Sequence, residues 1–388
     1  MCAIAGVFRL AGVDTKPVSM MAKSLIHRGP DEHTVRRYGG RTAYAAFGIE
    51  RLAIVDQQGG QQPARDASNR WVVALNGEIY NHSRIRKELQ ANGTVFRSTS
   101  DTEVVAALIA TVGIQRGLAQ CHGMFAMAIL DTQERRLFLV RDRMGVKPLH
   151  WTELTDGTVA FASEIKGLRA HPRTQWKLNA AAVQSFLVSE YIPTPDTIWS
   201  GVHKVEPGTW VEVTRSGIKH HRWWSPPVGR SGAPGNFERW ATSLHGALQV
   251  ATTTRMEAEV PIAYLLSGGI DSASVCALAA ERSPSPIHTF SMQVEGAGFD
   301  ESNAAERTAH SIGSHHHTEK LGVQDLEVLV EQIVAMMDEP LADSSLLATW
   351  KLMRVVSGAG FKCAISGDGA DEILAGYPTY LAHRLASL

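Results

Sequence analysis

The apolar and polar positions in the second half of the chain predict strands that alternate with helices. An apolar run at residues 260–266 has the length of a buried strand, and residues 273–281 have the pattern of a helix. The pattern continues with a strand at 287–293, helices at 302–312, 323–337 and 345–357, and a strand at 362–365. This order is typical of a doubly wound α/β fold, whose parallel sheet binds ligands at the carboxyl ends of its strands.

A change in composition between residues 201 and 235 separates this part of the chain from the first. Glycine and proline are frequent there, which indicates a turn-rich, partly β connector. Asn236 then precedes a helical pattern whose apolar residues recur every three or four positions. We therefore expect a first domain at residues 1–205, a connector at 206–235 and a second domain at 236–388.

The overall composition is that of an ordinary soluble protein. The 388 residues are 44% hydrophobic and 20% charged, and the net charge of −1 argues against a nucleic-acid or membrane-surface partner held by electrostatics. No apolar stretch approaches the roughly 20 residues that span a bilayer, and the first residues do not resemble a signal peptide. The four cysteines form no CxxC pair, which favours reduced thiols. We therefore expect a cytoplasmic protein without a nucleic-acid or membrane partner.

The sequence SGGIDS at residues 267–272 lies between the predicted strand and helix, where it is suited to bind phosphate. Two glycines let the backbone approach a ligand closely, and the start of the helix presents free N–H groups to an anion. Ser267 and Ser272 add hydroxyl donors, and Asp271 offers a carboxylate to a metal ion. A plain glycine-rich turn is the alternative for such a sequence taken alone.

A second polar segment, SGDGADE at residues 366–372, follows the last predicted strand. Its acidic residues are compatible with an ordinary turn and helix N-terminus, where carboxylates are favoured. Two acidic strand ends at one edge of a sheet are better explained by Mg²⁺, which prefers oxygen ligands and bridges phosphates.

Cys2 is a candidate nucleophile. If Met1 is removed, Cys2 carries both a thiol and an α-amino group, whose ordinary pKa of about 8 allows it to act as a general base for the thiol. One residue then supplies both nucleophile and base. The alternative is a small buried residue on a first strand.

A series of short segments follows Cys2 in one order: MCAIAG (1–6), HRGPD (27–31), RLAIVD (51–56), NGEIYN (76–81), SDTE (100–103), GMFAMAILD (123–131), RDRMGVKPL (141–149) and FASEIK (161–166). Together they resemble the class II glutamine amidotransferases, which are N-terminal-nucleophile hydrolases with a four-layer α/β/β/α fold. The resemblance implies this sandwich for roughly residues 1–200, and it implies that Cys2 hydrolyses the side-chain amide of glutamine. The chain departs from the family at Ala3, where the family usually has Gly.

Amide hydrolysis passes through a negatively charged tetrahedral intermediate, which needs hydrogen-bond donors. By the resemblance, the side chain of Asn76 and the backbone N–H of Gly77 form this oxyanion hole. Arg51 can pair with the carboxylate of glutamine, and Glu78 and Asp101 can neutralise its ammonium group. Each also has a plainer interpretation, for example Arg51 as a surface cation, and Asp101, or its neighbour Ser100, as the cap of the helical run that follows.

SGGIDS resembles the PP-loop of ATP pyrophosphatases. With FDE (299–301), DEPLADSS (338–345), which adds further carboxylates, and SGDGADE, it resembles the synthetase domain of the glutamine-hydrolysing asparagine synthetase family. The resemblance implies an ATP site made of residues at two strand ends and two residues that border the adenine: Ser267, Gly268, Gly269, Asp271, Ser272, Ser366 and Gly367, with Leu266 and Met292 at the adenine.

The same resemblance implies roles for three acidic residues. Asp271 and Asp371 would hold Mg²⁺. Asp368 stands where the family carries an acid that is important for forming an acyl-adenylate.

The two resemblances together imply a glutamine-dependent asparagine synthetase. Cys2 would release ammonia from glutamine, the second domain would convert aspartate and ATP to β-aspartyl-AMP, and ammonia would then displace AMP. The implied partners are glutamine, aspartate and ATP, with Mg²⁺ as the cofactor and a homodimer as the assembly.

Two alternatives stay open. One is an amidotransferase for another carboxylate, such as a uronic sugar or a natural-product precursor. The other is a truncated paralogue that binds ATP or another subunit without synthesis, because the chain stops at Leu388 whereas the family's synthetase domain continues. We expect that the chain is part of a longer protein, since SGGIDS and SGDGADE keep the residues that the chemistry needs.

Overall fold

The structure, a computed structural model, describes residues 2–56, 59–227, 236–296 and 301–386. Met1, on whose removal the hypothesis for Cys2 depends, lies outside the described residues, as do Phe299 and Asp300 of the FDE segment. The chain divides into two compact units. The first is Met1–Gly229 with Met337–Ala342, and the second is Arg230–Met336 with Asp343–Leu388.

Two antiparallel six-stranded sheets form the centre of the first unit. One has the order β10-β8-β9-β1-β3-β2, with bounds Val202–Lys204, His150–Glu153, Val159–Ala162, Ala3–Phe8, Ala45–Arg51 and Glu32–Tyr38. The other has the order β12-β11-β7-β6-β5-β4, with bounds Gly217–Arg222, Thr209–Thr214, Arg136–Arg141, Gly123–Asp131, Trp71–Ile79 and Ala64–Arg65. Strand β1 is buried on both faces, because Ile4 and Phe8 join one apolar cluster and Ala5 and Val7 another.

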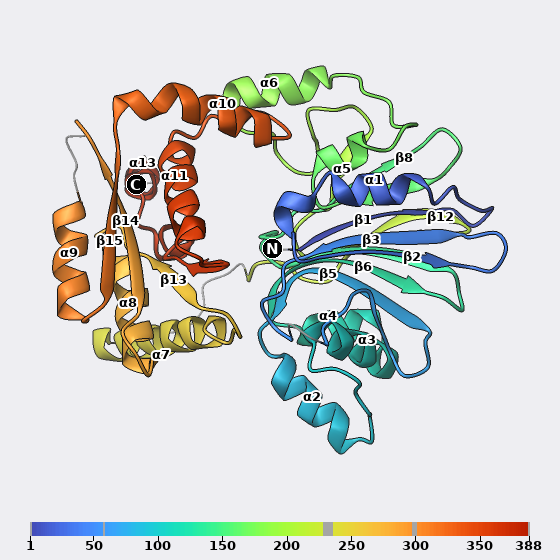
Figure 1. The fold of residues 1–388 in the computed structure, drawn as a ribbon, viewed down its shortest axis with the longest axis horizontal. Coiled ribbons are helices and arrows are strands. Elements are labelled where there is room, and N and C mark those ends of the chain that lie inside the picture. Colours follow the sequence, from blue (N-terminus) through green and yellow to red (C-terminus); the bar gives the residue numbers. More distant parts are fainter. Residues whose placement is uncertain (1, 57–58, 228–235, 297–300, 387–388) are drawn as a thin grey trace. The chain divides into compact units, whose positions relative to one another are not determined.

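Helices cover the outer face of each sheet. Figure 1 shows α1 and α5 on one side of the two sheets and α3 and α4 on the other. The helices of this unit are α1 (Pro17–Lys23), α2 (His82–Ala91), α3 (Asp101–Val112), α4 (Ile114–Gln120), α5 (Ile165–Arg169) and α6 (Ala180–Ser189), with a 3-10 turn η1 at Ile26–Arg28. The predicted α/β/β/α sandwich is therefore confirmed.

The first unit extends past the boundary expected at residue 205. Strands β11 and β12 lie in the region that we interpreted as a connector, and β11 pairs with β7, with Val211 opposite Leu139. Val211 and Val213 pack between the sheets. Composition obscured these strands because they are short and are followed by a turn-rich stretch.

Four parallel strands form the sheet of the second unit, in the order β15-β14-β13-β16. Their bounds are His315–Leu321, His288–Val294, Ile262–Leu265 and Cys363–Ile365, and the helices are α7 (Phe237–Arg255), α8 (Ile270–Arg282), α9 (Ser302–Ser311), α10 (Leu326–Met336), α11 (Ser345–Gly358), α12 (Ala370–Leu374) and α13 (Pro378–Ala386), with a 3-10 turn η2 at Val323–Asp325.

Both faces of this sheet are covered by helices. Tyr264 packs in one cluster with residues of α8 and α9, and its neighbour Ala263 packs in another with Val356 of α11. Figure 1 likewise shows the strands between α9 and α11. The predicted doubly wound parallel sheet is confirmed. Within the part of the chain that the structure describes, none of the helices has the length and apolar character that crossing a bilayer requires.

Candidate active site

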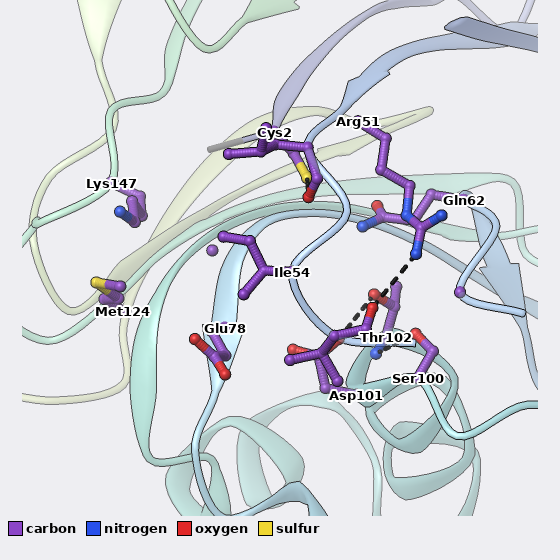
Figure 2. Close-up of a pocket in the computed structure, with 14 residues that line it drawn as sticks. Cys2, Arg51, Ile54, Gln62, Glu78, Ser100, Asp101, Thr102, Met124 and Lys147 are labelled. Atoms are coloured by element: carbon purple, nitrogen blue, oxygen red, sulfur yellow. Dashed lines mark hydrogen bonds between the residues drawn. The ribbon is translucent and has the colours of Figure 1, made fainter. Parts of the chain in front are cut away.

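A pocket in the first unit is lined by Cys2, Arg51, Gly77, Glu78 and Asp101 together with nine other residues. These five were all predicted from sequence as parts of a glutamine site. They come from the segment before β1, the end of β3, the end of β5 and the start of α3. Figure 2 shows the labelled side chains of Cys2, Arg51, Glu78 and Asp101 around one space. The structure therefore brings these residues together.

Cys2 is buried, with 8% of its surface exposed, and its Sγ lies 3.7 Å from the carbonyl oxygen of Leu52. Burial raises the pKa of the Cys2 thiol, and the charge of Asp101 adds to this effect. The thiol therefore needs a base before it can act as a nucleophile. Ala3, the departure from the family pattern, packs in the apolar cluster of β1 and α1 and is not among the lining residues. Its methyl group is accommodated in the core.

Asn76 and Gly77 are consecutive residues of β5, and Gly77 lines the pocket whereas Asn76 is not among the lining residues. Asn76 is fully buried, and among the described residues neither Nδ2 nor Oδ1 of its side chain has a hydrogen-bond partner. An unpaired buried amide is costly, so its presence suggests a partner that arrives with the substrate. Gly77 has φ +138°, and a Cβ there would overlap the carbonyl oxygen of Met124. Only glycine fits this position, and Gly77 is one of the residues that line the pocket.

Arg51 is 6% exposed, so its interpretation as a surface cation is wrong. Its Nη2 donates to the carbonyl oxygens of Asp56 at 2.5 Å and Val55 at 3.3 Å, and its Nη1 lies 3.4 Å from Oε2 of Glu32. These contacts hold a positive charge at the wall of the pocket, as recognition of a carboxylate requires.

Asp101 is held inside the pocket by backbone groups. Its Oδ2 accepts a hydrogen bond from the N–H of Ile79 at 3.0 Å, and burial raises the pKa of its carboxyl group. Ser100, and not Asp101, is the cap of α3, because Ser100 Oγ accepts from the N–H of Thr102 at 3.1 Å. The carboxylate of Asp101 and that of Glu78 are thus two acidic groups of one pocket that also holds the cation of Arg51.

Lys147 also lines the pocket, although the sequence did not single it out. It is 5% exposed, and its backbone N–H donates to Oδ2 of Asp142 at 3.0 Å. Figure 2 shows Lys147 and Arg51 on opposite sides of Cys2. Burial, with the positive charge of Arg28, lowers the pKa of Lys147 to about 8. Its place within RDRMGVKPL was the one signal available, since a lysine in a turn is usually a surface residue.

This lowered pKa leads to a stability prediction. Below about pH 8 Lys147 is protonated in both the folded and the unfolded protein, so the folded protein bears the full cost of burying the charge. Between about pH 8 and 10.5 the lysine is neutral in the folded protein and still protonated in the unfolded chain. The unfolded chain then binds more protons, so the free energy of unfolding rises with pH in this range. Lys147→Met should therefore stabilise the protein at pH 7 by up to about 3 kcal/mol, and the gain should shrink towards pH 10. Thermal unfolding at both pH values measures this. The exposed Lys87→Met is the control, and a variant less stable than wild type at pH 7 would contradict the prediction.

The SGGIDS turn of the second unit has the form expected from the sequence. Gly269 is the N-cap of α8, so Asp271 and Ser272 lie in the first helical turn. Ser272 Oγ accepts from the N–H of Ser267 at 3.1 Å and lies 3.0 Å from Ser267 Oγ. Gly268 has φ +94°, and a Cβ there would meet the carbonyl oxygen of Glu301. These bonds fix a turn whose backbone a ligand can approach closely.

The second predicted strand end lies beside this turn. A Cβ on Gly367 would come within 2.8 Å of the backbone nitrogen of Ser272. The adjacent Ser366 Oγ donates to Oδ2 of Asp368 at 2.8 Å. The prediction that SGGIDS and SGDGADE meet at one edge of the sheet is therefore supported by direct proximity.

The two residues expected at the adenine have different environments. Leu266 is 1% exposed, and its side chain packs in the core with Tyr264 and Cys276. Met292 on β14 is half-buried. A nucleotide base beside Leu266 would therefore contact its backbone and not its side chain.

Two of the three carboxylates that DEPLADSS adds, those of Asp338 and Glu339, contact the first unit, whereas Asp343 belongs to the second. Asp338 accepts hydrogen bonds from the backbone of Ile165 and Lys166, and Glu339 from that of Ile198, all in the first unit. Asp271 and Asp371 follow the neighbouring strands β13 and β16. Within the described ranges, no three His, Cys, Asp or Glu residues gather closely enough to hold a metal ion. Two carboxylates fit a magnesium ion that also takes phosphate oxygens as ligands, which is the usual form of such sites.

Comparisons with known proteins match two families to two successive parts of the chain. Residues 1–224 match the glutamine amidotransferase domain family, and residues 243–388 match the asparagine synthase family. Glutamine-hydrolysing asparagine synthetase 1 of Bacillus subtilis is 31% identical over 98% of this chain and 59% of its own length. A putative glutamine-hydrolysing asparagine synthetase of Mycobacterium bovis is 33% identical over 98% and 60%. Amidase chyE of Penicillium rubens is 31% identical over 93% and 55%.

The chain thus spans less than two thirds of the length of these curated relatives. The first family match nevertheless covers more than half of the chain and includes the whole pocket around Cys2. We conclude that the protein belongs to the glutamine amidotransferase family, with a second part that is related to the asparagine synthases.

Proposed function

We propose that this protein hydrolyses glutamine at Cys2 and uses the ammonia for the ATP-dependent amidation of aspartate to asparagine. The observation that carries the proposal is the single pocket that contains Cys2, Arg51, Gly77, Glu78 and Asp101. Each of these residues is chemically complementary to one group of glutamine. The thiol suits the side-chain amide, the cation suits the α-carboxylate, the two carboxylates suit the ammonium group, and the glycine backbone suits the oxyanion. The proposal includes a cytoplasmic location, expected from the composition and from cysteines that form no CxxC pair, and a homodimer, taken from the family resemblance.

Hydrolysis begins with transfer of the thiol proton of Cys2 to its own α-amino group, once Met1 is removed. The thiolate attacks the side-chain amide carbon of glutamine, and the C=O electron pair moves to the oxygen. Asn76 Nδ2 and the N–H of Gly77 stabilise this oxyanion. The amide C–N bond then breaks, and the proton returns to the leaving nitrogen as ammonia. Water hydrolyses the resulting thioester to glutamate.

Substrate orientation comes from the charged residues of the pocket. The guanidinium group of Arg51 pairs with the α-carboxylate of glutamine. The carboxylates of Glu78 and Asp101 accept from its ammonium group. Such positioning converts a bimolecular reaction into an effectively unimolecular one, which supplies a large part of the rate.

In the second unit, Ser267, Ser272 and the backbone of Gly268 and Gly269 would bind the phosphates of ATP. Asp271 and Asp371 would hold magnesium, which neutralises phosphate charge when bound. Asp368 assists the attack of the aspartate side-chain carboxylate on the α-phosphorus. Pyrophosphate leaves, and ammonia later displaces AMP.

The name of the relative amidase chyE favours a second candidate, the amidation of another carboxylate. The two are separated by supplying ATP, Mg²⁺ and glutamine with either aspartate or a panel of other carboxylic acids. We expect aspartate to be the one acid supplied that is amidated, with asparagine, AMP and pyrophosphate formed in equal amounts. Turnover of another acid without aspartate turnover would favour the second candidate, and formation of ADP would contradict both.

A further inference from the structure

The segment Met337–Ala342 belongs to the first unit, although α10 and α11 on either side of it in the chain belong to the second. Asp338 accepts hydrogen bonds from the N–H of Ile165 at 2.5 Å and of Lys166 at 3.2 Å. Its carboxylate also lies 3.3 Å from Nζ of Lys166. Three donors at the start of α5 therefore fix this one carboxyl group.

Two other residues attach the same segment. The carboxylate of Glu339 pairs with Nζ of Lys204 and accepts from the N–H of Ile198 at 3.3 Å. The N–H of Ala342 donates to the carbonyl oxygen of Glu190 at 2.9 Å. These contacts attach the segment without involving Lys166, which makes them useful for comparison.

A continuous series of polar contacts connects Asp338 to the nucleophile. Nζ of Lys166 lies 3.0 Å from Oε2 of Glu164, and Oε1 of Glu164 lies 2.5 Å from Nη1 of Arg28. Nε of Arg28 donates to the carbonyl oxygen of Cys2 at 3.2 Å. The side chains of Arg28 and Glu164 are only 8% and 16% exposed, so solvent and salt screen their interaction weakly.

The hydrogen bond from Arg28 fixes the backbone of Cys2, a residue that the strand pairing of β1 does not hold in place. Cys2 precedes the first residue of β1, so it lies outside the hydrogen-bonded strand. Once Met1 is removed, Cys2 is a chain terminus, and termini are poorly ordered unless they are held. A displacement of about 1 Å at a reacting group costs up to roughly 10²-fold in rate.

The charges of the network are balanced by Asp338. Burial alone would raise the pKa of Glu164, but the hydrogen bond from His27 and the charges of Arg28 and Lys166 hold it well below its ordinary value. Glu164 is therefore a carboxylate shared between these cations. If Asp338 is neutralised, Lys166 depends more strongly on Glu164, and the hold of Glu164 on Arg28 weakens.

We infer that Asp338 is a positioning residue for Cys2, although it lies in the part of the chain that matches the asparagine synthases. The inference rests on the proposed hydrolysis of glutamine at Cys2. It makes the nucleophile of the first unit depend on the attachment of a segment that joins α10 and α11. Asp338 touches no reacting atom and acts through Lys166, Glu164 and Arg28.

The test is Asp338→Asn in the 388-residue protein. We expect kcat for ammonia release from glutamine to fall about 3- to 30-fold. The KM for glutamine should change less than about twofold, because the residues that bind it are untouched. Glu339→Gln is the matched control, since it removes the ion pair with Lys204 in the same segment, and it should leave kcat unchanged. Equal losses in both variants would mean that attachment alone matters, and would overturn the inference.

A second measurement does not need the enzyme to be active. The rate of alkylation of Cys2 by iodoacetamide is followed from pH 6 to 10 by mass spectrometry of the N-terminal peptide. We expect Asp338→Asn to change this profile and Glu339→Gln to leave it as in wild type. A changed profile in a protein that releases no ammonia would reject the proposed function and keep the positioning role. Normal hydrolysis of glutamine by Asp338→Asn, with an unchanged alkylation profile, would reject the positioning role and keep the proposed function.

If Asp338→Asn does not fold, Lys166→Met interrupts the network at the next link and leaves the backbone bonds of Asp338 in place. It should give the same loss of kcat and the same change in alkylation. A Lys166→Met protein with wild-type values would overturn the inference.

Discussion

Cys2→Ala is expected to abolish ammonia release from glutamine, with a loss in kcat of about 10⁴-fold or more, because the attacking group itself is removed. Synthesis from free ammonia should continue, since the second unit does not use the thiol. Ammonia release is measured with a coupled assay, and product formation by chromatography with glutamine or ammonium chloride as the nitrogen source.

Cys121 provides the matched control for this experiment. It is a buried thiol of the same unit, burial raises its pKa to about 12, and it does not line the pocket. Cys121→Ala should keep its glutaminase activity within about twofold of wild type, even if packing is weakened. Undiminished glutamine hydrolysis in Cys2→Ala, or active protein that still carries Met1, would refute the proposed use of Cys2.

Asn76→Ala is expected to lower kcat for glutamine hydrolysis by about 10²- to 10³-fold with little change in KM, because the amide acts on the transition state and not on bound substrate. The structure adds an unusual expectation for stability. Among the described residues the amide of Asn76 has no hydrogen-bond partner, so its removal should leave the free energy of unfolding unchanged or raise it slightly.

Asn81→Ala is the counterpart to this variant. The side chain of Asn81 donates to the carbonyl oxygen of Gln120 and accepts from the N–H of His122, both at 2.9 Å. Its loss should lower the free energy of unfolding by about 1–2 kcal/mol and spare kcat. Steady-state kinetics and urea unfolding of both variants test the contrast. A normal kcat in Asn76→Ala would exclude the side chain from the oxyanion hole.

The sequence predicted most of the fold and five of the residues that line the pocket around Cys2, partly from residue patterns and partly through the family resemblance. The apolar runs at β13 and β14 predicted the parallel sheet of the second unit, but the largely polar β15 was absent from the predicted order. The sandwich of the first unit was implied by the family resemblance of the segments that contain Cys2, Arg51 and Asp101. The sequence does not reveal burial directly, however. Arg51 and Lys147 are both cations in polar stretches, and only their packing shows that they line a cavity.

Long-range contacts of polar residues were also beyond prediction. Asp338 and Glu339 have the composition of a metal-binding turn, and nothing local shows that their partners are Lys166 and Lys204. The pairs are separated by more than a hundred positions in the chain. Single-sequence patterns describe neighbours along the chain, so they do not identify such partners.

Because Met337–Ala342 belongs to the first unit, the protein cannot be cut into its two units at a single position in the chain. A fragment that ends after β12 contains every strand of the first unit but lacks the two carboxylates that this segment supplies to Lys166 and Lys204. Chimeras made by exchanging whole halves between this protein and its relatives would lack the same contacts unless Asp338 and Glu339 are exchanged together with Lys166 and Lys204. The residues that complete the first unit therefore do not all lie on one side of a single position in the sequence.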